Sequence, residues 1–301
     1  MENNNMTLRQ ATNRVEIEGY LKRKELTMKT NSKGINAIYG NLVVLTAPGN
    51  EVEINVYCSE KTSSGEMSKA FPGMKTIYNE WVSMADLMNG ENPMTSEEAM
   101  RNCTKLTTNG QLSRREYYGQ TGEFVSRLCV TSNFFNHIDE VINPRASFRV
   151  EAYIRTVKEE DKAGEPTGPA KVEAWVPVYG GQVLPFDFVV PAELVNDFEN
   201  LYSAGNTAMF NGDYINCLTR TASHTQGFGR AMETTTRTQE LVIMGGEVPY
   251  EEGDAKAFSS EAIKKAEMVR MNETIPAMEA RSKNASAPSA GLQKAASGFT
   301  F

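Results

Sequence analysis

Two stretches far apart in the chain carry the same alternating pattern. The first covers residues 14–23 and the second residues 148–155. In each, apolar residues fall on one side of a two-residue period, and the other side carries Arg, then Glu, then Tyr, then Lys or Arg. Because successive side chains of a β-strand point to opposite faces, both stretches predict strands with a buried face and a similar outer face. The repeat indicates a fold that is built twice.

Each copy is followed by the same series of elements. After the first strand come strands at 38–45 and 51–58, an amphipathic helix at 74–88, a polar stretch at 89–103, and strands at 105–112 and 124–130. After the second come a loop at 164–169, strands at 171–178 and 182–190, a helix from Pro191, and strands at 206–216 and 234–244. The fourth strand of each series contains an Asn-Gly pair, Asn109-Gly110 and Asn211-Gly212. Two-residue periods predict strands, and apolar residues spaced by three or four predict helices.

This order of elements is that of the oligonucleotide/oligosaccharide-binding barrel, the OB-fold. We predict a mainly β protein of two tandem OB-fold-like β-barrels, at residues 10–143 and 146–250, each with one helix between strands three and four. Residues 251–301 are predicted to form an acidic linker, a short helix from Ser260 to about Met271, and a flexible tail. The two-residue period by itself also fits a small sandwich.

Composition places few limits on the fold and more on the setting. With 301 residues and 40% hydrophobic content, one or two domains with real cores can form. No segment resembles a signal peptide or reaches the length of a membrane span. The scattered cysteines, Cys58, Cys103, Cys129 and Cys217, favour buried free thiols in a reducing compartment. We therefore expect a cytoplasmic protein.

The charge of the chain is unevenly distributed. The net charge is −7, but residues 1–158 hold 19 Lys and Arg against 18 Asp and Glu, whereas residues 159–301 hold 12 against 20. A binding groove needs a local basic stripe rather than a basic protein. The acidity of the later part is therefore a weak argument against an anionic partner.

Residue patterns typical of enzymes are hard to find. The two histidines, His137 and His224, have no second metal ligand at a helical or loop spacing. Neither a phosphate-binding loop nor a nucleophile elbow occurs. We predict that the protein is not an enzyme and uses no cofactor or metal.

Aromatic and cationic residues fall on the predicted outer faces of the strands. Proteins bind single strands by stacking bases on aromatic rings while cations follow the phosphates. The outward candidates are Tyr20, Lys22, Tyr39, Tyr57, Tyr153, Arg155, Lys171, Trp175 and Tyr179. Trp175 is the most informative, because so large an apolar surface is rarely exposed without a reason. Alternatively, these rings pack against the other module. Glutamates on the same faces, Glu16, Glu18, Glu53, Glu151 and Glu173, argue against a uniformly basic groove.

The connections between the fourth and fifth strands supply a second set of candidates. In this fold they often close over a ligand. The first carries Arg114, Arg115, Tyr117 and Tyr118, and the second carries Arg220, Phe228 and Arg230. A solvated loop explains the arginines equally well, but not the aromatic residues. Trp81, by contrast, is assigned to the core by its helical spacing with Ile77 and Met84.

The arrangement over about residues 10–250 resembles single-stranded DNA-binding proteins of bacteriophages and, more loosely, the bacterial single-strand-binding family. The resemblance is best at residues 14–23, at Asn109-Gly110-Gln111-Leu112 followed by residues 114–118, and at their counterparts in the second module. The resemblance implies coating of exposed DNA strands in replication, recombination or repair, without catalysis or a cofactor. Such proteins commonly end in an acidic tail whose last residues, often including Phe, recruit partner proteins. The resemblance therefore implies partner recruitment through Phe299 and Phe301, although the acidity of this chain lies at 247–261.

We therefore predict a protein that binds single-stranded DNA with little sequence preference. The main alternative is a non-enzymatic phage interaction or structural protein whose outward aromatics form an oligomer interface. An RNA-binding protein is a third hypothesis, since the same surface accepts ribose.

Overall fold

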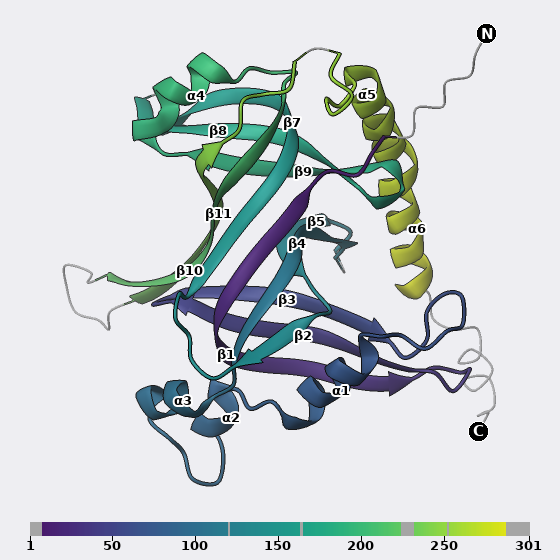
Figure 1. Ribbon diagram of the computed structural model, residues 1–301, viewed down its shortest axis with the longest axis vertical. Coiled ribbons are helices and arrows are strands. Elements are labelled where there is room, and N and C mark those ends of the chain that lie inside the picture. Colours follow the sequence, from purple (N-terminus) through teal and green to yellow (C-terminus); the bar gives the residue numbers. More distant parts are fainter. Residues whose placement is uncertain (1–7, 120, 163–164, 224–231, 252, 287–301) are drawn as a thin grey trace, which may run out of the picture.

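The computed structural model describes residues 8–119, 121–162, 165–223, 232–251 and 253–286 (Figure 1). The first half contains β1 (Asn13–Thr30), β2 (Asn36–Ala47), β3 (Asn50–Ser59), α1 (Phe71–Glu80), α2 (Met84–Met88), α3 (Ser96–Asn102), β4 (Lys105–Tyr118), β5 (Phe124–Thr131) and β6 (Phe135–Ile138). The second contains β7 (Arg145–Lys162), β8 (Glu165–Val178), η1 (Tyr179–Gly181), β9 (Gln182–Val190), η2 (Ala192–Leu194), α4 (Val195–Leu201), β10 (Thr207–Ser223) and β11 (Met232–Gly246). The chain is mainly β, as predicted.

Strand pairing closes each half into a five-stranded barrel. In the first barrel, β1 pairs with β2 and β4, β2 with β3, β4 with β5, and β3 runs parallel to β5. In the second, β7 pairs with β8 and β10, β8 with β9, β10 with β11, and β9 runs parallel to β11. This pairing order, with helices between the third and fourth strands, is the predicted OB-fold.

The two barrels match residue by residue in their first strands. Tyr20 lies opposite Leu45 in one barrel and Tyr153 opposite Trp175 in the other. An irregularity follows in both, between residues 21 and 23 and between residues 154 and 156. The duplication predicted from sequence is thus visible in the register, and Tyr20 corresponds to Tyr153.

The Asn-Gly pairs sit inside strands, where the backbone comes close to a neighbouring strand. A Cβ on Gly110 would lie 2.8 Å from the carbonyl oxygen of Thr131, and one on Gly212 would lie 1.9 Å from that of Val242. Only glycine fits such an approach. Gly110 lies opposite Val15 and Gly212 opposite Phe148, which makes Val15 and Phe148 corresponding residues.

The barrels are joined side by side through their first strands. β1 and β7 pair antiparallel, with Val15 opposite Phe148, so an approximate two-fold axis passes between them. One hydrophobic cluster runs through both barrels, and Figure 1 shows β1 lying between β4 and β7. The division into separate domains at residues 10–143 and 146–250 stays a prediction.

A buried glutamate of each first strand holds the segment that enters the other barrel. Glu18 accepts hydrogen bonds from the backbone N–H groups of Ile142 (2.8 Å) and Asn143 (2.9 Å) and from Arg145 (2.8 Å). Glu151 accepts from Arg9 (2.8 Å) and from the Thr12 N–H (3.2 Å). The prediction that these glutamates line an exposed face was wrong, since Glu18 is 8% and Glu151 2% exposed. They stabilise the junction of the barrels.

We expect Glu18→Gln to destabilise the protein in a pH-dependent way. The hydrogen bond from Asn143, with those from Ile142 and Arg145, lowers the pKa of Glu18 below its ordinary 4.5. The charged form is therefore favoured by folding, and its contribution is present above that pH and lost as the pH falls through the folded pKa. Glu18→Gln should cost about 1–3 kcal/mol at pH 7, measured by urea unfolding.

The control is Glu16→Gln, two residues away on the same strand, where the carboxylate is 40% exposed and pairs with Arg14 and Arg145. Exposed pairs contribute little, so this variant should stay close to the wild type. An equal cost of Glu18→Gln at pH 7 and at pH 3 would contradict the assigned role.

The connection between β3 and β4 differs from the prediction of one helix at 74–88. After α1, Trp81 is extended (ψ 138°), and Ser83 starts α2 with a capping box to Asp86. A second capping box, Thr95 with Glu98, starts α3 inside the stretch described from sequence only as polar. Such Ser/Thr-x-x-Asp/Glu pairs mark helix starts, and apolar spacing alone does not reveal the break. Trp81 is buried, as predicted.

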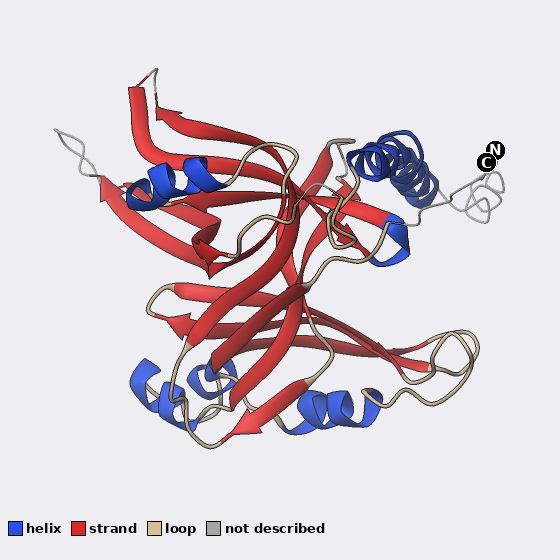
Figure 2. Cartoon of the chain, turned by 45° about the horizontal axis from the view of Figure 1, so that its top comes forward, coloured by secondary structure: helices blue, strands red, loops and turns tan. Residues whose placement is uncertain are grey.

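The C-terminal segment is an ordered helix that links the two barrels. It consists of α5 (Ser260–Val269), a π-helical turn η3 (Arg270–Thr274) and α6 (Ile275–Ser286); we call residues 260–286 the strap. Ile263 and Ala266 join the hydrophobic core, and the strap runs beside both barrels (Figures 1 and 2). The helix predicted to end at about Met271 continues to Ser286, so the first part of the predicted flexible tail is helical. None of the helices in the described ranges combines the length and apolar character needed to span a bilayer.

Candidate nucleic-acid interface

The outer face of the first barrel carries two tyrosines side by side. Tyr39 on β2 lies directly opposite Tyr57 on β3. Tyr57 is 65% exposed, Tyr39 is half-buried, and the Lys29 ammonium lies 5.8 Å from the centre of the Tyr39 ring. Cross-strand partners point to the same face of a sheet. The predicted outward orientation of both rings is confirmed.

A pocket of about 410 Å³ continues this face from Tyr57 toward β4 and β5. Phe134, which is 68% exposed, also lines it. Its polar side chains are the amides of Asn55, Asn109, Gln111 and Asn133 and the hydroxyls of Thr131 and Ser132. We call this the amide pocket. Sequence analysis missed both Phe134 and the amides. The signal lay in Phe134-Phe135, where Phe135 packs edge-on against buried Trp81 (6.3 Å between centroids) and so leaves its neighbour outside.

Two arginines face each other on the ribbon formed by β4 and β5. Arg115 pairs directly with Arg127, both are exposed, and the Arg115 guanidinium lies 6.0 Å from the Tyr117 ring centre. Neither has a carboxylate partner in the part of the chain that the structure describes. Like charges directly opposite one another destabilise a sheet, and an anion between them would remove that cost. Arg115 lies four residues along β4 from Gln111, and thus on the same face.

The prediction that residues 114–118 form a loop was wrong, because they continue β4. Strand geometry separates neighbours: Arg115 and Tyr117 face outward, whereas Arg114 is turned inward. Arg114 donates from Nε to the Pro185 carbonyl (2.5 Å) and covers the Phe186 ring at 5.7 Å. Burial lowers its pKa. Arg114 is therefore a structural residue, and Tyr118 packs on Phe124 with 5.4 Å between ring centres.

The prediction that Trp175 faces solvent was also wrong. Trp175 is 5% exposed, and the Arg155 guanidinium lies over its ring at 4.9 Å. Arg155 in turn pairs with Glu267 of the strap (3.8 Å). Arg155 and its ion pair with the strap thus lie on the outer side of Trp175, so an alternating pattern that leaves Trp175 outside the barrel does not leave it in water. Its cross-strand partner Tyr153 is partly buried against the core.

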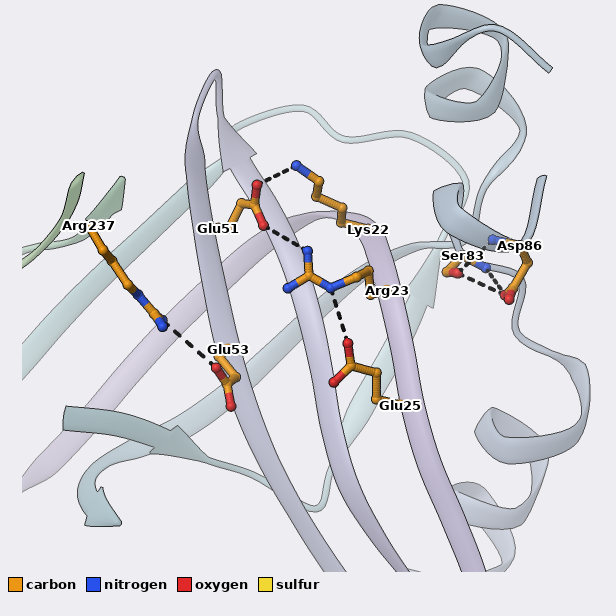
Figure 3. Close-up of polar contacts among 8 residues, drawn as sticks. All are labelled: Lys22, Arg23, Glu25, Glu51, Glu53, Ser83, Asp86 and Arg237. Carbon is orange, nitrogen blue, oxygen red and sulfur yellow. Dashed lines mark hydrogen bonds and ion pairs between the residues drawn. The ribbon is translucent and has the colours of Figure 1, made fainter. Parts of the chain in front are cut away.

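Other predicted cations are engaged in ion pairs within the sheets. Lys22 and Arg23 share Glu51, with Arg23 at 3.1 Å, and Arg237 of β11 reaches Glu53 at 3.8 Å (Figure 3). Lys171 pairs with Asp187 at 3.3 Å. Tyr20 packs against the small cluster formed by α2 and α3. These contacts hold the barrels together and leave Tyr20, Lys22 and Lys171 less available to a ligand.

The second barrel has no equivalent of the tyrosine pair. Leu45 and Glu51 form a cross-strand pair in the first barrel, and Trp175 and Pro185 form the corresponding pair in the second. Counted along the strands from these pairs, the positions that correspond to Tyr39 and Tyr57 are Pro169 and Pro191. Tyr179 is 87% exposed but lies apart, in η1. The candidate interface is therefore confined to the first barrel and the β4–β5 ribbon.

Several predicted residues cannot be placed. Phe228, Arg230, Phe299 and Phe301 lie outside the described residues. Arg220 belongs to β10, where its backbone pairs with Thr235.

The barrels and their outer face define the chain as a tandem OB-fold protein. It belongs to the YorF family, whose model matches residues 11–280. No curated protein matches the sequence. Among solved structures, the chain is similar to the wild-type single-stranded DNA binding protein from Thermus aquaticus, with 13% identity, a TM-score of 0.42, and 81% of this chain and 95% of that chain covered. A deletion mutant of the same protein gives 14% identity, a TM-score of 0.42, and coverage of 82% and 98%. Neither likeness is close enough to establish a shared function.

Proposed function

We propose that this protein binds single-stranded DNA with little sequence preference, through the outer face of its first barrel, and catalyses no reaction. The observation that carries the proposal is the pair of exposed rings, Tyr57 and Phe134, that line the uncharged amide pocket. Unpaired bases offer flat apolar faces to such rings and polar edges to the amides between them. A duplex hides both the faces and most of the edges.

Cations near this pocket would bind the phosphates. Lys29 lies beside Tyr39, and the Arg115–Arg127 pair stands along the ribbon on the same face. Because the arginines repel one another in the free protein, a phosphate placed between them contributes attraction and removes repulsion. The acidity of the later half of the chain lies on the second barrel, the linker and the strap.

In the cell, such a protein would coat exposed strands during replication, recombination or repair. This part of the proposal is supported by the fold class, which serves single-strand binding in many proteins, and by the pattern of the sequence. The recruitment of replication or recombination proteins by Phe299 and Phe301 stays a prediction.

The alternative is an interaction protein in which Tyr57 and Phe134 are buried between copies of the chain. One observation favours it: Phe134 directly precedes β6, which is a terminal strand of the sheet. Terminal strands can pair with another chain.

Titration of fluorescently labelled oligo-dT and of a duplex of equal length at low salt tests the two functions. The proposal predicts that the single strand binds at least tenfold more tightly and that its affinity falls as salt rises. Absence of binding, together with protein-concentration-dependent self-association in sedimentation, would instead support the alternative.

Replacing the arginine pair tests the phosphate contact. Each phosphate that a protein neutralises on a single strand contributes about 0.7 to the slope of log affinity against log salt. Arg115→Ala/Arg127→Ala should therefore lower that slope by about 1.4 without lowering the thermal stability, because two like charges are removed. The control is Lys264→Ala/Lys265→Ala, two exposed cations of the strap. An unchanged slope in the arginine variant would remove the pair from the interface.

A further inference from the structure

Two of the four amides of the amide pocket, those of Asn109 and Asn133, have an oxygen that is already engaged and a nitrogen that is not. The Asn133 Oδ1 accepts a hydrogen bond from the Tyr57 backbone N–H (3.3 Å). The Asn109 Oδ1 accepts two from the Arg14 guanidinium, at 3.3 and 3.1 Å. Because N–H groups can only donate, these contacts fix which amide atom is the oxygen. Within the described residues, neither Nδ2 group has a protein partner.

No carboxylate in the lining of the pocket competes with a ligand for these two donors. The residues around the pocket include the amides, two aromatic rings, Thr131 and Ser132, but no Asp or Glu. A carboxylate would attract the Nδ2 groups and occupy them. The pocket therefore offers a ligand two fixed hydrogen-bond donors, with Gln111 able to turn either its oxygen or its nitrogen toward the ligand.

The bases differ in how well their edges match such a donor pair. On the Watson–Crick edge, thymine presents the acceptors O2 and O4, and cytosine presents O2 and N3. Adenine presents only N1 there and guanine only O6. Each base also carries N–H groups on this edge, including the cytosine N4 amine and the thymine N3–H, so the classes differ in the number of acceptors. A pyrimidine edge can thus accept from two donors where a purine edge accepts from one.

We propose that the amide pocket selects pyrimidines, with Asn109 and Asn133 as the residues that determine this preference. The inference rests on the proposed function and adds a preference between base classes to a protein that reads no particular sequence. One additional hydrogen bond per engaged base corresponds to about a tenfold difference in affinity between oligo-dT and oligo-dA.

The test measures the affinities of the wild type and of Asn109→Asp/Asn133→Asp for oligo-dT and oligo-dA of about 30 nucleotides each. The substitution keeps an oxygen for Arg14 and for the Tyr57 N–H and replaces each Nδ2 donor by an acceptor. Added negative charge weakens binding of both oligonucleotides, and base stacking within oligo-dA is the same for both proteins. The change in the ratio of the two affinities between wild type and variant isolates the donors, and the ratio should fall about tenfold.

Asn211→Asp is the matched control, because Asn211 holds the corresponding place before Gly212 in the second barrel. It should leave the ratio unchanged. The single variants Asn109→Asp and Asn133→Asp should each lower the ratio in part, which provides a result if the double variant is poorly folded by circular dichroism. A ratio unchanged in all three pocket variants, with both oligonucleotides bound, overturns the selectivity and leaves single-strand binding standing. Failure of the wild type to bind either oligonucleotide overturns both.

Discussion

Tyr57→Ala/Phe134→Ala should weaken binding of oligo-dT by about 2–6 kcal/mol, because stacking contributes about 1–3 kcal/mol for each base engaged. Both rings project from the sheet, at 65% and 68% exposure, and support no part of the core. The thermal stability should therefore change by less than about 0.5 kcal/mol. Fluorescence anisotropy of a labelled oligonucleotide at fixed salt measures the loss of affinity.

The matched control is Tyr179→Ala, which removes an aromatic ring that is even more exposed (87%) but lies on the second barrel, away from the amide pocket. It should retain nearly full affinity. Similar losses in both variants would show that exposed aromatic surface acts non-specifically, and no loss in either would move the interface elsewhere.

Glu116→Gln should destabilise the fold by about 3–5 kcal/mol, the cost of leaving buried charge unpaired. The Glu116 carboxylate pairs with Arg270 of the strap, and the two side chains are only 4% and 8% exposed. Arg114 is half-buried nearby on the same face of β4, and after burial itself the Arg270 charge adds to the effects that lower its pKa. Removing the Glu116 carboxylate leaves the buried Arg270 guanidinium without its ion-pair partner and near the like charge of Arg114. Urea unfolding measures the loss.

The control for this variant is Glu279→Gln, which breaks the exposed pair of Glu279 with Lys283 on α6. Exposed pairs of that kind contribute little to stability, so this variant should stay close to the wild type. The strap of the Glu116 variant should also become sensitive to limited proteolysis, since its main polar contact with β4 is lost. Equal stability of the two variants would contradict the role of the buried pair.

The topology could be predicted from sequence because the two-residue period records which face of each strand is buried. β9 was predicted with its observed ends, and the Asn-Gly pairs marked corresponding points of β4 and β10. The duplication helped because two copies of the same order constrain one another. The outward orientation of Tyr39 and Tyr57 followed from the same alternation.

The site could be predicted only in part, because a strand period says which side of a sheet a residue occupies and not what covers that side. Trp175 points out of its barrel, as the alternation requires, but Arg155 lies over its ring and pairs with Glu267 of the strap, which comes from 85 or more residues later in the chain. Such long-range contacts leave no trace in local spacing. The amides of the pocket were overlooked because Asn and Gln are also typical of ordinary surfaces, and only their convergence in space distinguishes them.

The most direct test of the central claim places a fluorescent ring at the proposed stacking position. The two native tryptophans, Trp81 and Trp175, are 9% and 5% exposed, so their emission should respond little to DNA. In Tyr57→Trp, the introduced indole should be strongly quenched by oligo-dT and not by duplex, because a stacked base quenches the ring it covers. Emission that stays unchanged while labelled oligo-dT is bound in the same sample would show that single strands bind this protein somewhere other than the outer face of its first barrel.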